Sequence, residues 1–586
     1  GDHRDLHSFP TRRSSDLVDL GAGDRNLLRA RSSLNLPVSA NAAIKLAALY
    51  REKDGFIDNT GPGGNFGDAV ASGYRLDWRW RPHPTLTVDY SWNSSRVESY
   101  NYTPQAVLPG MTTGTPADAA IVSSQRFVPY AERRLDQLAT SVPLQPNDTD
   151  IEGHALQIGW ELKDFTVRSI SAWRQLDDDS YIDFASGASA EYRLDFGAVT
   201  LGAQGSGQQH YDETRTRLQQ RQFSQELQLI GPLGDTLDLV AGGYFFREEA
   251  EENWFPLHHI FSFPVIASDD QAVAVNLRAE DNRIDNRAVA TYAQLTWSPI
   301  ADWAFTLGWR YTRDTRDFRA RASKRFSDNA FSFIIQYQPG EDTMLYAKLA
   351  EAYKSGGFNT RDPDPIFFSQ GFDEEKNRTL EIGMKSEWLQ RALRVNSALF
   401  YSRFSDMQLN FLLPGTLSDT RVFNSGAARL AGLELEMVAM PVHGLLARLN
   451  YAYLHSAIDD VDDPFSGSPR AFGFSNAPGH SASFNLDYQF PPWSAGTLSA
   501  NINYTYTDER DTDSPFNVID AHQLLGARLT LSEIDMPQGE LTVSAWVSNL
   551  LDEEYVTFTI DNLPHASRAV LWGEPRSWGL DIRFRY

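Results

Sequence analysis

Aromatic rings and imidazoles that could hold a metal chelate stand close together in the stretch WFPLHHIFSF, residues 254 to 263. Trp254, His258 and His259 are the side chains of this stretch that could contact such a ligand. Rings supply large apolar contact surfaces, and a neutral imidazole nitrogen is a common metal ligand. The same side chains could equally pack the surrounding loop against its neighbours. The sequence leaves both interpretations open.

Tyr353 and Phe358 form a second pair of this kind, beside two consecutive glycines at positions 356 and 357. Either ring could contact a ligand, or both could pack a loop in the ordinary way. As for the first stretch, the residue types alone do not decide between the two roles.

Two acidic runs could bind a divalent cation, because hard cations prefer carboxylate oxygens. Their members are Glu248, Glu249, Glu251 and Glu252 in the first run and Asp459, Asp460, Asp462 and Asp463 in the second. Neither spacing matches an EF-hand, so solvated acidic loops are the simpler interpretation. The stretch GPGGNFG, residues 61 to 67, lacks the Lys-Ser/Thr of a phosphate-binding loop and predicts an extracellular loop. We therefore predict no catalytic residues, no cofactor site and no metal site.

The composition excludes some classes of protein. The chain of 586 residues carries a net charge of -24, and such an acidic balance argues against nucleic-acid binding. It contains no cysteine, so disulfides and cysteine-based metal sites are absent. Mean hydropathy is -0.41, and no run of about 18 apolar residues predicts a transmembrane helix. A transmembrane β-barrel remains open, because its lipid-facing and lumen-facing residues cancel in a hydropathy average.

Strict alternation of apolar and polar residues is the dominant pattern along the chain, as in residues 482–490 and 498–506. Such runs last about nine residues, which is the length that a tilted strand needs to cross a bilayer. Between them, short Pro- and Gly-containing turns alternate with long connections. The long connections include residues 93–150, 176–222, 247–287, 354–378 and 456–479. Short periplasmic turns and long extracellular loops are typical of outer-membrane barrels, and we predict an all-β antiparallel barrel of about 22 strands.

The last segment, SWGLDIRFRY, alternates to its final residue. Its apolar members are Trp578, Leu580, Ile582, Phe584 and Tyr586, with polar residues or glycine between them. We predict that this strand presents its apolar side to lipid and its polar side to the lumen. Its terminal tyrosine would then lie in the aromatic girdle at the periplasmic interface, and the strand would be important for barrel assembly.

The first residues do not fit this pattern. Residues 5–17, DLHSFPTRRSSDL, resemble translated sequencing-adapter read-through, and no apolar core of a signal peptide is present. We expect residues 1–17 to be non-native, and residues 18–586 to form the barrel, with a first strand that is truncated. We expect the first 17 residues to be irregular, or to pair only briefly with the last strand.

Several motifs resemble TonB-dependent outer-membrane receptors of the siderophore and iron-complex type. The strongest resemblance is at NLLDEEY and GEPRSWGLDIRFRY, within residues 549–586. Similar barrel motifs occur at residues 35–56, 223–229, 345–359, 380–388 and 424–437. The resemblance extends over nearly the whole chain from about residue 18. Its motifs are specific for the family but not for a particular ligand.

The resemblance implies an outer-membrane receptor of a Gram-negative bacterium that actively takes up ferric-siderophore-like ligands. The implied partners are outer-membrane lipid, the ligand and the TonB complex, and we expect a monomer. Members of the family carry a plug domain and a TonB-contacting box before the barrel, and neither is visible in this sequence. We therefore expect this chain to be the barrel portion. Two alternatives remain, a passive porin and an outer-membrane enzyme, although porins usually have 16–18 strands.

Overall fold

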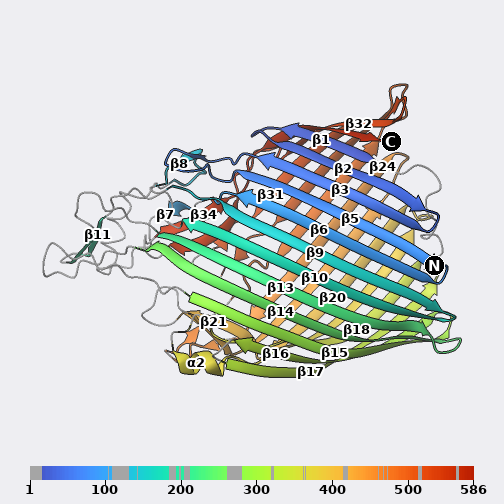
Figure 1. The fold of residues 1–586 in the computed structure, drawn as a ribbon, viewed down its shortest axis with the longest axis horizontal. Helices are drawn as coiled ribbons and strands as arrows, with labels where there is room; N and C mark the ends of the chain where they lie inside the picture. Colours follow the sequence, from blue (N-terminus) through green and yellow to red (C-terminus); the bar gives the residue numbers. More distant parts are fainter. Residues whose placement is uncertain are drawn as a thin grey trace.

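A closed wall of antiparallel strands runs through almost the whole chain (Figure 1). The computed structural model describes residues 16–102, 104–108, 131–140, 143–183, 193–196, 199–202, 212–259, 280–318, 322–360, 362, 364–412, 420–459, 461–465, 467–470, 473–512, 518–562 and 567–586. Within them, one 22-stranded sheet closes on itself, as predicted. No helix in these residues is long and apolar enough to cross a membrane.

The 22 strands of the barrel follow one another in sequence order, each paired with its predecessor and its successor. They are β1 (Leu17–Gly23), β2 (Leu28–Ser39), β3 (Ala42–Lys53), β5 (Ala69–His83), β6 (Leu86–Ser99), β9 (Asn147–Leu162), β10 (Phe165–Asp183), β13 (Asp212–Pro232), β14 (Leu237–His259), β15 (Glu280–Ile300), β16 (Trp303–Phe318), β17 (Ala322–Gly340), β18 (Thr343–Lys354), β19 (Glu375–Trp388), β20 (Leu393–Ser405), β23 (Ala427–Ala439), β24 (Leu445–Ile458), β27 (His480–Gln489), β28 (Thr497–Thr507), β31 (His522–Met536), β32 (Gly539–Ser548) and β35 (Ser577–Arg585).

Shorter elements lie in the connections at one end of the barrel. They are β4 (Asp58–Asn59), β7 (Gln105–Leu108), β8 (Gln137–Leu138), β11 (Arg193–Phe196), β12 (Val199–Gly202), α2 (Pro365–Gln370), β21 (Gln408–Leu412), β22 (Thr420–Asn424), β25 (Val461–Asp462), β26 (Pro469–Arg470), β29 (Arg510–Asp511), β30 (Val518–Ile519), β33 (Val556–Asn562) and β34 (Ser567–Trp572). The opposite end carries only short turns, such as residues 84–85, 301–302 and 341–342. The predicted division into long extracellular loops and short periplasmic turns is therefore confirmed.

The first and last strands close the barrel. β1 pairs with β35 over all seven of its residues, from Leu17 opposite Arg585 to Gly23 opposite Gly579. β1 is short, so it faces only residues 28–33 of β2 on its other side. The regular ladder between β1 and β35 closes the barrel. It includes Leu17, the last residue of the segment that was expected to be irregular or to pair only briefly. The expected irregularity of residues 1–15 lies outside the described residues.

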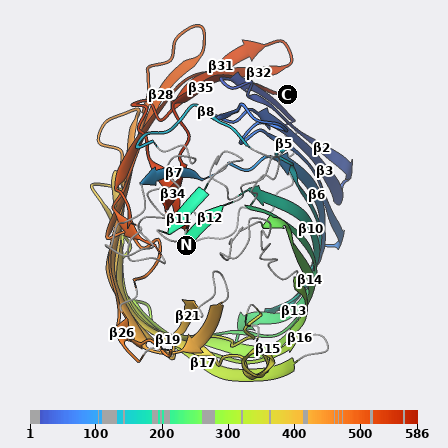
Figure 2. The same cartoon turned by 90° about the vertical axis from the view of Figure 1, so that its left-hand side faces the viewer.

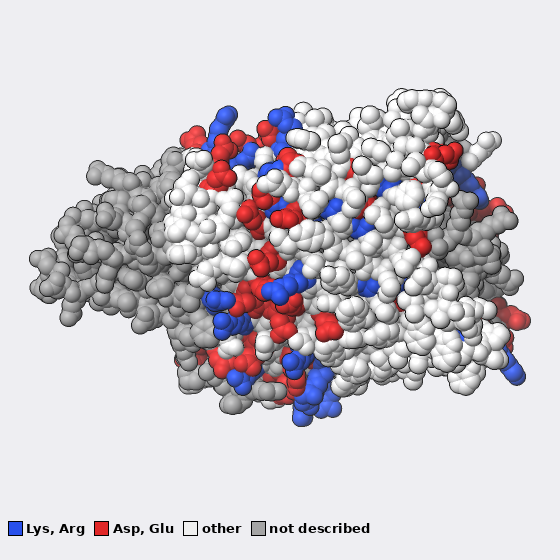
Figure 3. All heavy atoms as spheres, turned by 45° about the horizontal axis from the view of Figure 1, so that its top comes forward, with Lys and Arg blue, Asp and Glu red and all other residues white. Residues whose placement is uncertain are grey.

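The outer face of the barrel is apolar over a broad belt. Along β35, Trp578, Leu580, Ile582 and Tyr586 are exposed, while Phe584 is partly buried between neighbours. Between them, Asp581 is buried on the inner face. Figure 3 shows a wide region of the outer wall with few charged residues, next to a band where Lys, Arg, Asp and Glu gather. This alternation is the pattern expected of strands with lipid on one side and a polar lumen on the other.

Several strands extend well beyond their predicted ends. The alternating pattern ends near Arg247 in β14, yet the strand continues to His259. The predicted loop at residues 247–287 is therefore wrong at both ends, because β14 occupies its start and β15 begins at residue 280. Above the apolar belt both faces of a strand meet water or polar groups, so no period-2 signal marks the strand there. Strand pairing continues nonetheless, since backbone hydrogen bonds need no particular side chain.

On the inner face, a cluster of charges spans the closing strands. Asp19 of β1 is only 1% exposed and accepts a hydrogen bond of 2.8 Å from Arg583 of β35. Asp581 of β35 accepts bonds of 2.8 Å from Arg29 of β2 and of 2.9 Å from Arg528 of β31. These five side chains connect β31, β35, β1 and β2 across the point of closure. Each bond to a charged group stabilises the fold by about 1.5–3 kcal/mol.

Asp581→Asn should therefore loosen the closing seam. The asparagine side chain is neutral and has a single acceptor oxygen, so it cannot replace the carboxylate that accepts hydrogen bonds from both arginines. We therefore expect the free energy of unfolding to fall by about 2 kcal/mol. The measurement is the temperature at which the folded barrel loses its compact mobility on a detergent gel. Asp487→Asn is the matched control, because Asp487 also pairs with an arginine, Arg448 at 2.7 Å, but on β27, away from the seam. An equal shift in both variants would contradict a special role of the seam.

Candidate ligand-binding mouth

The long connections gather at the extracellular end and form two packed groups. Figure 2 looks into this end and shows β8 near one wall and β21 near the opposite wall. The first group combines residues 54–68 with residues 100–102, 135–140 and 143–144. The second combines residues 355–374, the β21–β22 hairpin and the segment that contains β25 and β26.

Trp254, His258 and His259 do not lie in a loop, as the sequence had suggested. All three belong to the upper part of β14, where Trp254 is opposite Thr216 of β13 and Glu280 of β15. His258 and His259 are opposite Glu213 and Asp212 of β13. They are thus fixed on the wall of the mouth. Their contact with a ligand remains a prediction.

The acidic run from Glu248 to Glu252 is also part of β14 rather than a solvated loop. Glu248 accepts hydrogen bonds from Gln220 of β13 and, at 2.8 Å, from Asn286 of β15. Glu251 pairs with Arg283 at 3.1 Å. These carboxylates therefore hold neighbouring strands together above the belt.

Tyr353 and Phe358 both contact the upper end of β16. The Tyr353 hydroxyl donates to Asp314, which is buried. The Phe358 ring lies 6.4 Å from the Phe318 ring and 5.9 Å from that of Phe368 in α2. Tyr353 thus joins the upper ends of β18 and β16, and Phe358 fastens the start of the 355–374 connection to the wall. This geometry supports their role in packing the loop, and ligand contact remains a prediction.

A buried ion pair holds the 355–374 connection to the next loop. Asp362 accepts a hydrogen bond from Arg421 of β22, and both side chains are almost fully buried. The Arg421 guanidinium lies 3.4 Å from the centre of the Phe367 ring, a cation–π contact. Asn359 accepts a bond of 2.8 Å from the backbone N–H of Val422. Breaking a buried pair is costly, so these contacts fix the two loops as one unit.

An apolar cluster supports the same unit from the other side. Leu409 and Phe411 of β21 are buried against Val461 of β25. Phe423 and Phe465 pack around them with rings 5.9 Å apart. The connection that contains β21 and β22 and the connection that contains β25 and β26 thus share one small core above the barrel wall.

The opposite group has its own core. Ile57, Phe66, Leu138, Leu144 and Tyr181 are buried together, and the ring of Tyr102 stacks on Phe56 at 4.5 Å. Burial raises the pKa of the Tyr102 phenol to about 12, although a backbone hydrogen bond at Phe56 acts in the opposite direction.

The glycine-rich stretch at residues 61–67 is an extracellular loop, as predicted, and it belongs to this group. Its Gly63 has a φ of 96°, and a Cβ at this position would collide with the backbone of Leu144. Only glycine combines this conformation with such a close approach between the two segments.

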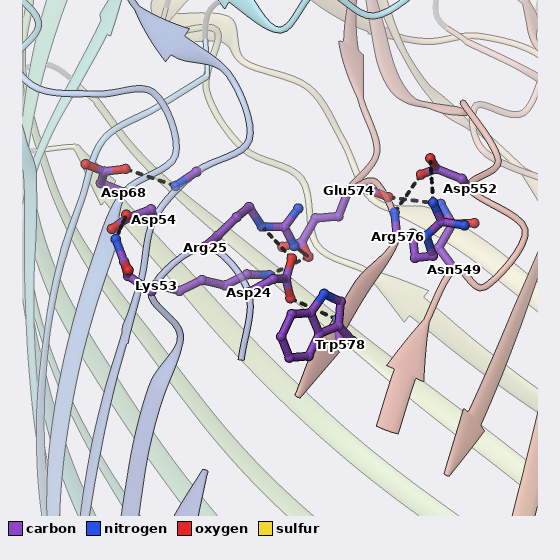
Figure 4. A network of polar contacts seen from close by, with 12 residues as sticks. Asp24, Arg25, Lys53, Asp54, Asp68, Asn549, Asp552, Glu574, Arg576 and Trp578 are labelled. Atoms are coloured by element: carbon purple, nitrogen blue, oxygen red, sulfur yellow. Dashed lines mark hydrogen bonds and ion pairs between the residues drawn. The ribbon is translucent and has the colours of Figure 1, made fainter. Parts of the chain in front are cut away.

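The last loop is bound to the first turn by the network in Figure 4. Glu574 pairs with Lys53 at 2.6 Å and with Arg25 at 3.4 Å. Asp24 accepts a bond of 2.8 Å from the backbone N–H of Trp578. Within the loop, Asp552 accepts a bond of 2.8 Å from the backbone N–H of Arg576. The NLLDEEY and GEPRSW motifs therefore have a structural role, which is to join the end of the chain to its beginning at the mouth.

The second acidic run also has partners within the protein. Asp459 pairs with Arg429 at 2.6 Å, and Asp463 accepts a backbone bond of 2.9 Å from Phe465 in a tight turn. Asp460 lies outside the described residues. Among the residues that the structure describes, no group of three or more His, Asp or Glu side chains could hold a metal ion.

A recess of about 550 Å³ opens on the inner wall between β18 and β28. Its polar lining includes Lys385, Glu434, Glu436 and Asn450, and Asn396 donates to Glu436 at 2.9 Å. This volume lies within the range of small-molecule sites, about 300–1,000 Å³. The sequence indicated a polar lumen but not this recess. Asp362 and Arg421 were also missed, because 59 positions separate them and no local pattern marks either.

The TonB dependent receptor-like β-barrel family model matches residues 91–550, most of the chain. The chain belongs to the TonB-dependent receptors. Its barrel therefore lies in the outer membrane, and the family consists of transport receptors rather than enzymes. Its 22 strands also distinguish it from porins with 16–18 strands, so neither alternative from the sequence is supported.

Among similar proteins, the pesticin receptors of Yersinia pestis and Yersinia enterocolitica are 25% identical to this receptor over 403 residues. The alignment covers 65% of this chain and 55% of the relatives, so this chain spans only about half of their length. The ferric yersiniabactin uptake receptor FyuA of Yersinia pestis has the same fold, with a TM-score of 0.73 and 17% identity, covering 99% of this chain and 81% of FyuA. The pyoverdine receptor FpvA of Pseudomonas aeruginosa PAO1 has a TM-score of 0.73 at 14% identity, and the match covers 99% of this chain and 79% of FpvA.

Proposed function

We propose that this receptor takes up a ferric siderophore or a similar scarce iron chelate through the mouth described above. The observation that supports it most is the combination of a 22-stranded barrel with long loops packed into two groups at one end. A passive pore needs no such loop cores, whereas a receptor needs a preorganised surface to select a ligand.

Similarity supports the ligand class. FyuA is an uptake receptor for ferric yersiniabactin. FpvA is an outer-membrane receptor that binds pyoverdine. The upper wall of this chain offers aromatic and imidazole side chains at Trp254, His258 and His259. We propose that the chelate contacts this part of the wall, and that TonB supplies the energy for its import in the complete receptor.

The test is binding of a panel of iron-55 chelates, with hydroxamate and catecholate members, to outer membranes that contain the receptor. We expect one class to bind, and Asp362→Ala to weaken that binding about tenfold, because leaving one charge of a buried pair without its partner costs about 3–5 kcal/mol, more than the ~1.4 kcal/mol that a factor of ten requires. Without Asp362, the buried Arg421 loses its partner and the loop unit loosens.

Asp342→Ala is the matched control. Asp342 also pairs with an arginine, Arg391 at 3.6 Å, but in a periplasmic turn. Binding of no chelate to a folded barrel would disprove the proposed function. Equal binding by the wild type and Asp362→Ala would disprove only the role of the loop unit.

A further inference from the structure

Three arginines lie directly opposite one another on adjacent strands. Arg378 of β19 is opposite Arg403 of β20, and Arg403 is opposite Arg429 of β23. We call these three residues the arginine row. Like charges directly opposite in a sheet are destabilising, so such a row is not explained by the stability of the wall alone.

The arginine row faces outward. Arg378 is two residues above Leu380 and Arg403 is two residues above Tyr401, and both apolar residues are exposed on the outer face. Side chains two positions apart share a face of the sheet, so the arginines continue the lipid-facing surface. On each strand, the outward positions between the periplasmic turn and the arginine carry no charge. The row therefore marks the upper edge of the apolar belt.

The charges at this edge are not balanced. Arg378 pairs with Glu351 of β18 at 2.7 Å, and Arg429 pairs with Asp459 at 2.6 Å, both at the outer ends of the row. Arg403 stands between the two other cations, is exposed, and forms no ion pair with another described residue. Two residues further up on β19, and therefore on the same face, Lys376 adds a fourth cation, paired with Asp328 at 3.3 Å. The arginine side chains remain open to the surroundings, with 69% exposure for Arg378 and 54% for Arg429.

We propose that the arginine row binds a phosphate group of a lipid in the outer leaflet. Guanidinium groups match phosphate oxygens through paired N–H donors, and an anion between them would relieve their mutual repulsion. Opposed residues are about 5 Å apart, so one phosphate can reach Arg403 and one neighbour together. The acyl chains of the same lipid would lie against Leu380 and Tyr401 below. This binding is separate from uptake of a ligand through the mouth.

The experiment measures binding of a fluorescent bis-phosphorylated lipid A, in detergent micelles, to the purified folded barrel. We expect Arg403→Gln to lower the bound fraction at limiting lipid about tenfold, the effect of losing one charge-assisted contact. Dephosphorylated lipid A with the same acyl chains should bind weakly to both proteins. Inorganic phosphate at millimolar concentration should not compete, which separates a lipid headgroup from a free phosphate. Higher salt should weaken the binding by screening it.

Arg391→Gln is the matched control, because this exposed arginine lies in the turn at the other end of β19 and β20. It should bind the phosphorylated lipid as the wild type does. Unfolding in phosphate-free detergent provides a second measurement. Without lipid, Arg403→Gln should unfold at the same temperature as the wild type or at a higher one, because the repulsion between the arginines is reduced. Added phosphorylated lipid should raise the unfolding temperature only of proteins that contain Arg403. Equal binding by Arg403→Gln, or equal binding of the dephosphorylated lipid, would overturn the proposal.

Discussion

Replacing Phe584 and Tyr586 with Ser should lower the amount of assembled barrel in the outer membrane several-fold, without changing the ligand affinity of the molecules that do assemble. Both rings belong to the apolar side of β35, where they lie 4.7 Å apart at the periplasmic end. β35 closes the barrel between β32 and β1. Each ring loses about 1–2 kcal/mol of apolar contact when it becomes a serine. The ligand-binding loops are at the other end of the strand, so affinity should not change.

Arg585→Ser is the control for this experiment. Arg585 lies between the two rings in sequence but on the other face of the strand, so its loss should leave the lipid contact intact. The measurement is the yield of folded receptor in outer-membrane fractions. Unchanged yield after the double replacement would refute the assembly role of the terminal aromatics.

Energised import should require a plug domain inside the barrel. In the described residues, the strands and their connections occupy the chain from Leu17 to Tyr586, and no separate domain lies among them. A barrel of 22 strands encloses a lumen wide enough for an aqueous channel unless something fills it. We propose that cells with this chain alone show a leaky outer membrane and no TonB-dependent uptake, and that a plug joined before residue 18 restores uptake.

The readout is accumulation of a labelled ferric siderophore, with and without a functional TonB complex. Entry of a large antibiotic that normally stays outside gives an independent measure of leakage. A barrel without a plug should admit the antibiotic, and the plug should block it. Equal TonB-dependent uptake from both proteins would mean that the barrel begins at a different point from the one assigned.

The number and order of the barrel strands could be predicted because lipid enforces a simple pattern. Every strand must place apolar side chains outward, so each crossing leaves a period-2 signal of about nine residues. The same reason explains where the prediction was wrong. Above the belt, the upper half of β14 carries Glu248 and Glu251. This part of β14 pairs with β15 as regularly as the part within the belt, but its sequence does not alternate and so cannot be distinguished from that of a loop.

The site was less predictable, because its main contacts join distant segments. Asp362 meets Arg421 only after two loops have folded together, and Tyr353 of β18 meets Asp314 of β16 only when the strands of the wall have paired. Neither pair has a characteristic spacing. The motif GEPRSWGLDIRFRY was recognised by resemblance, but the role of its Glu574 in fixing the last loop to Arg25 and Lys53 needed the closed barrel.

The tall part of the wall has a consequence for how the mouth can move. β14 has 23 residues and β27 has 10, a difference of about 40 Å along the strand at 3.3 Å per residue. The rim of the barrel therefore slopes from a high side at β13–β15 to a low side at β24–β35. The high side is hydrogen-bonded on both edges up to Trp254, so its backbone amides should exchange slowly with deuterium even though they stand in water. The high side is therefore the stiff part of the rim, and movements of the mouth should be larger in the connections above the shorter strands.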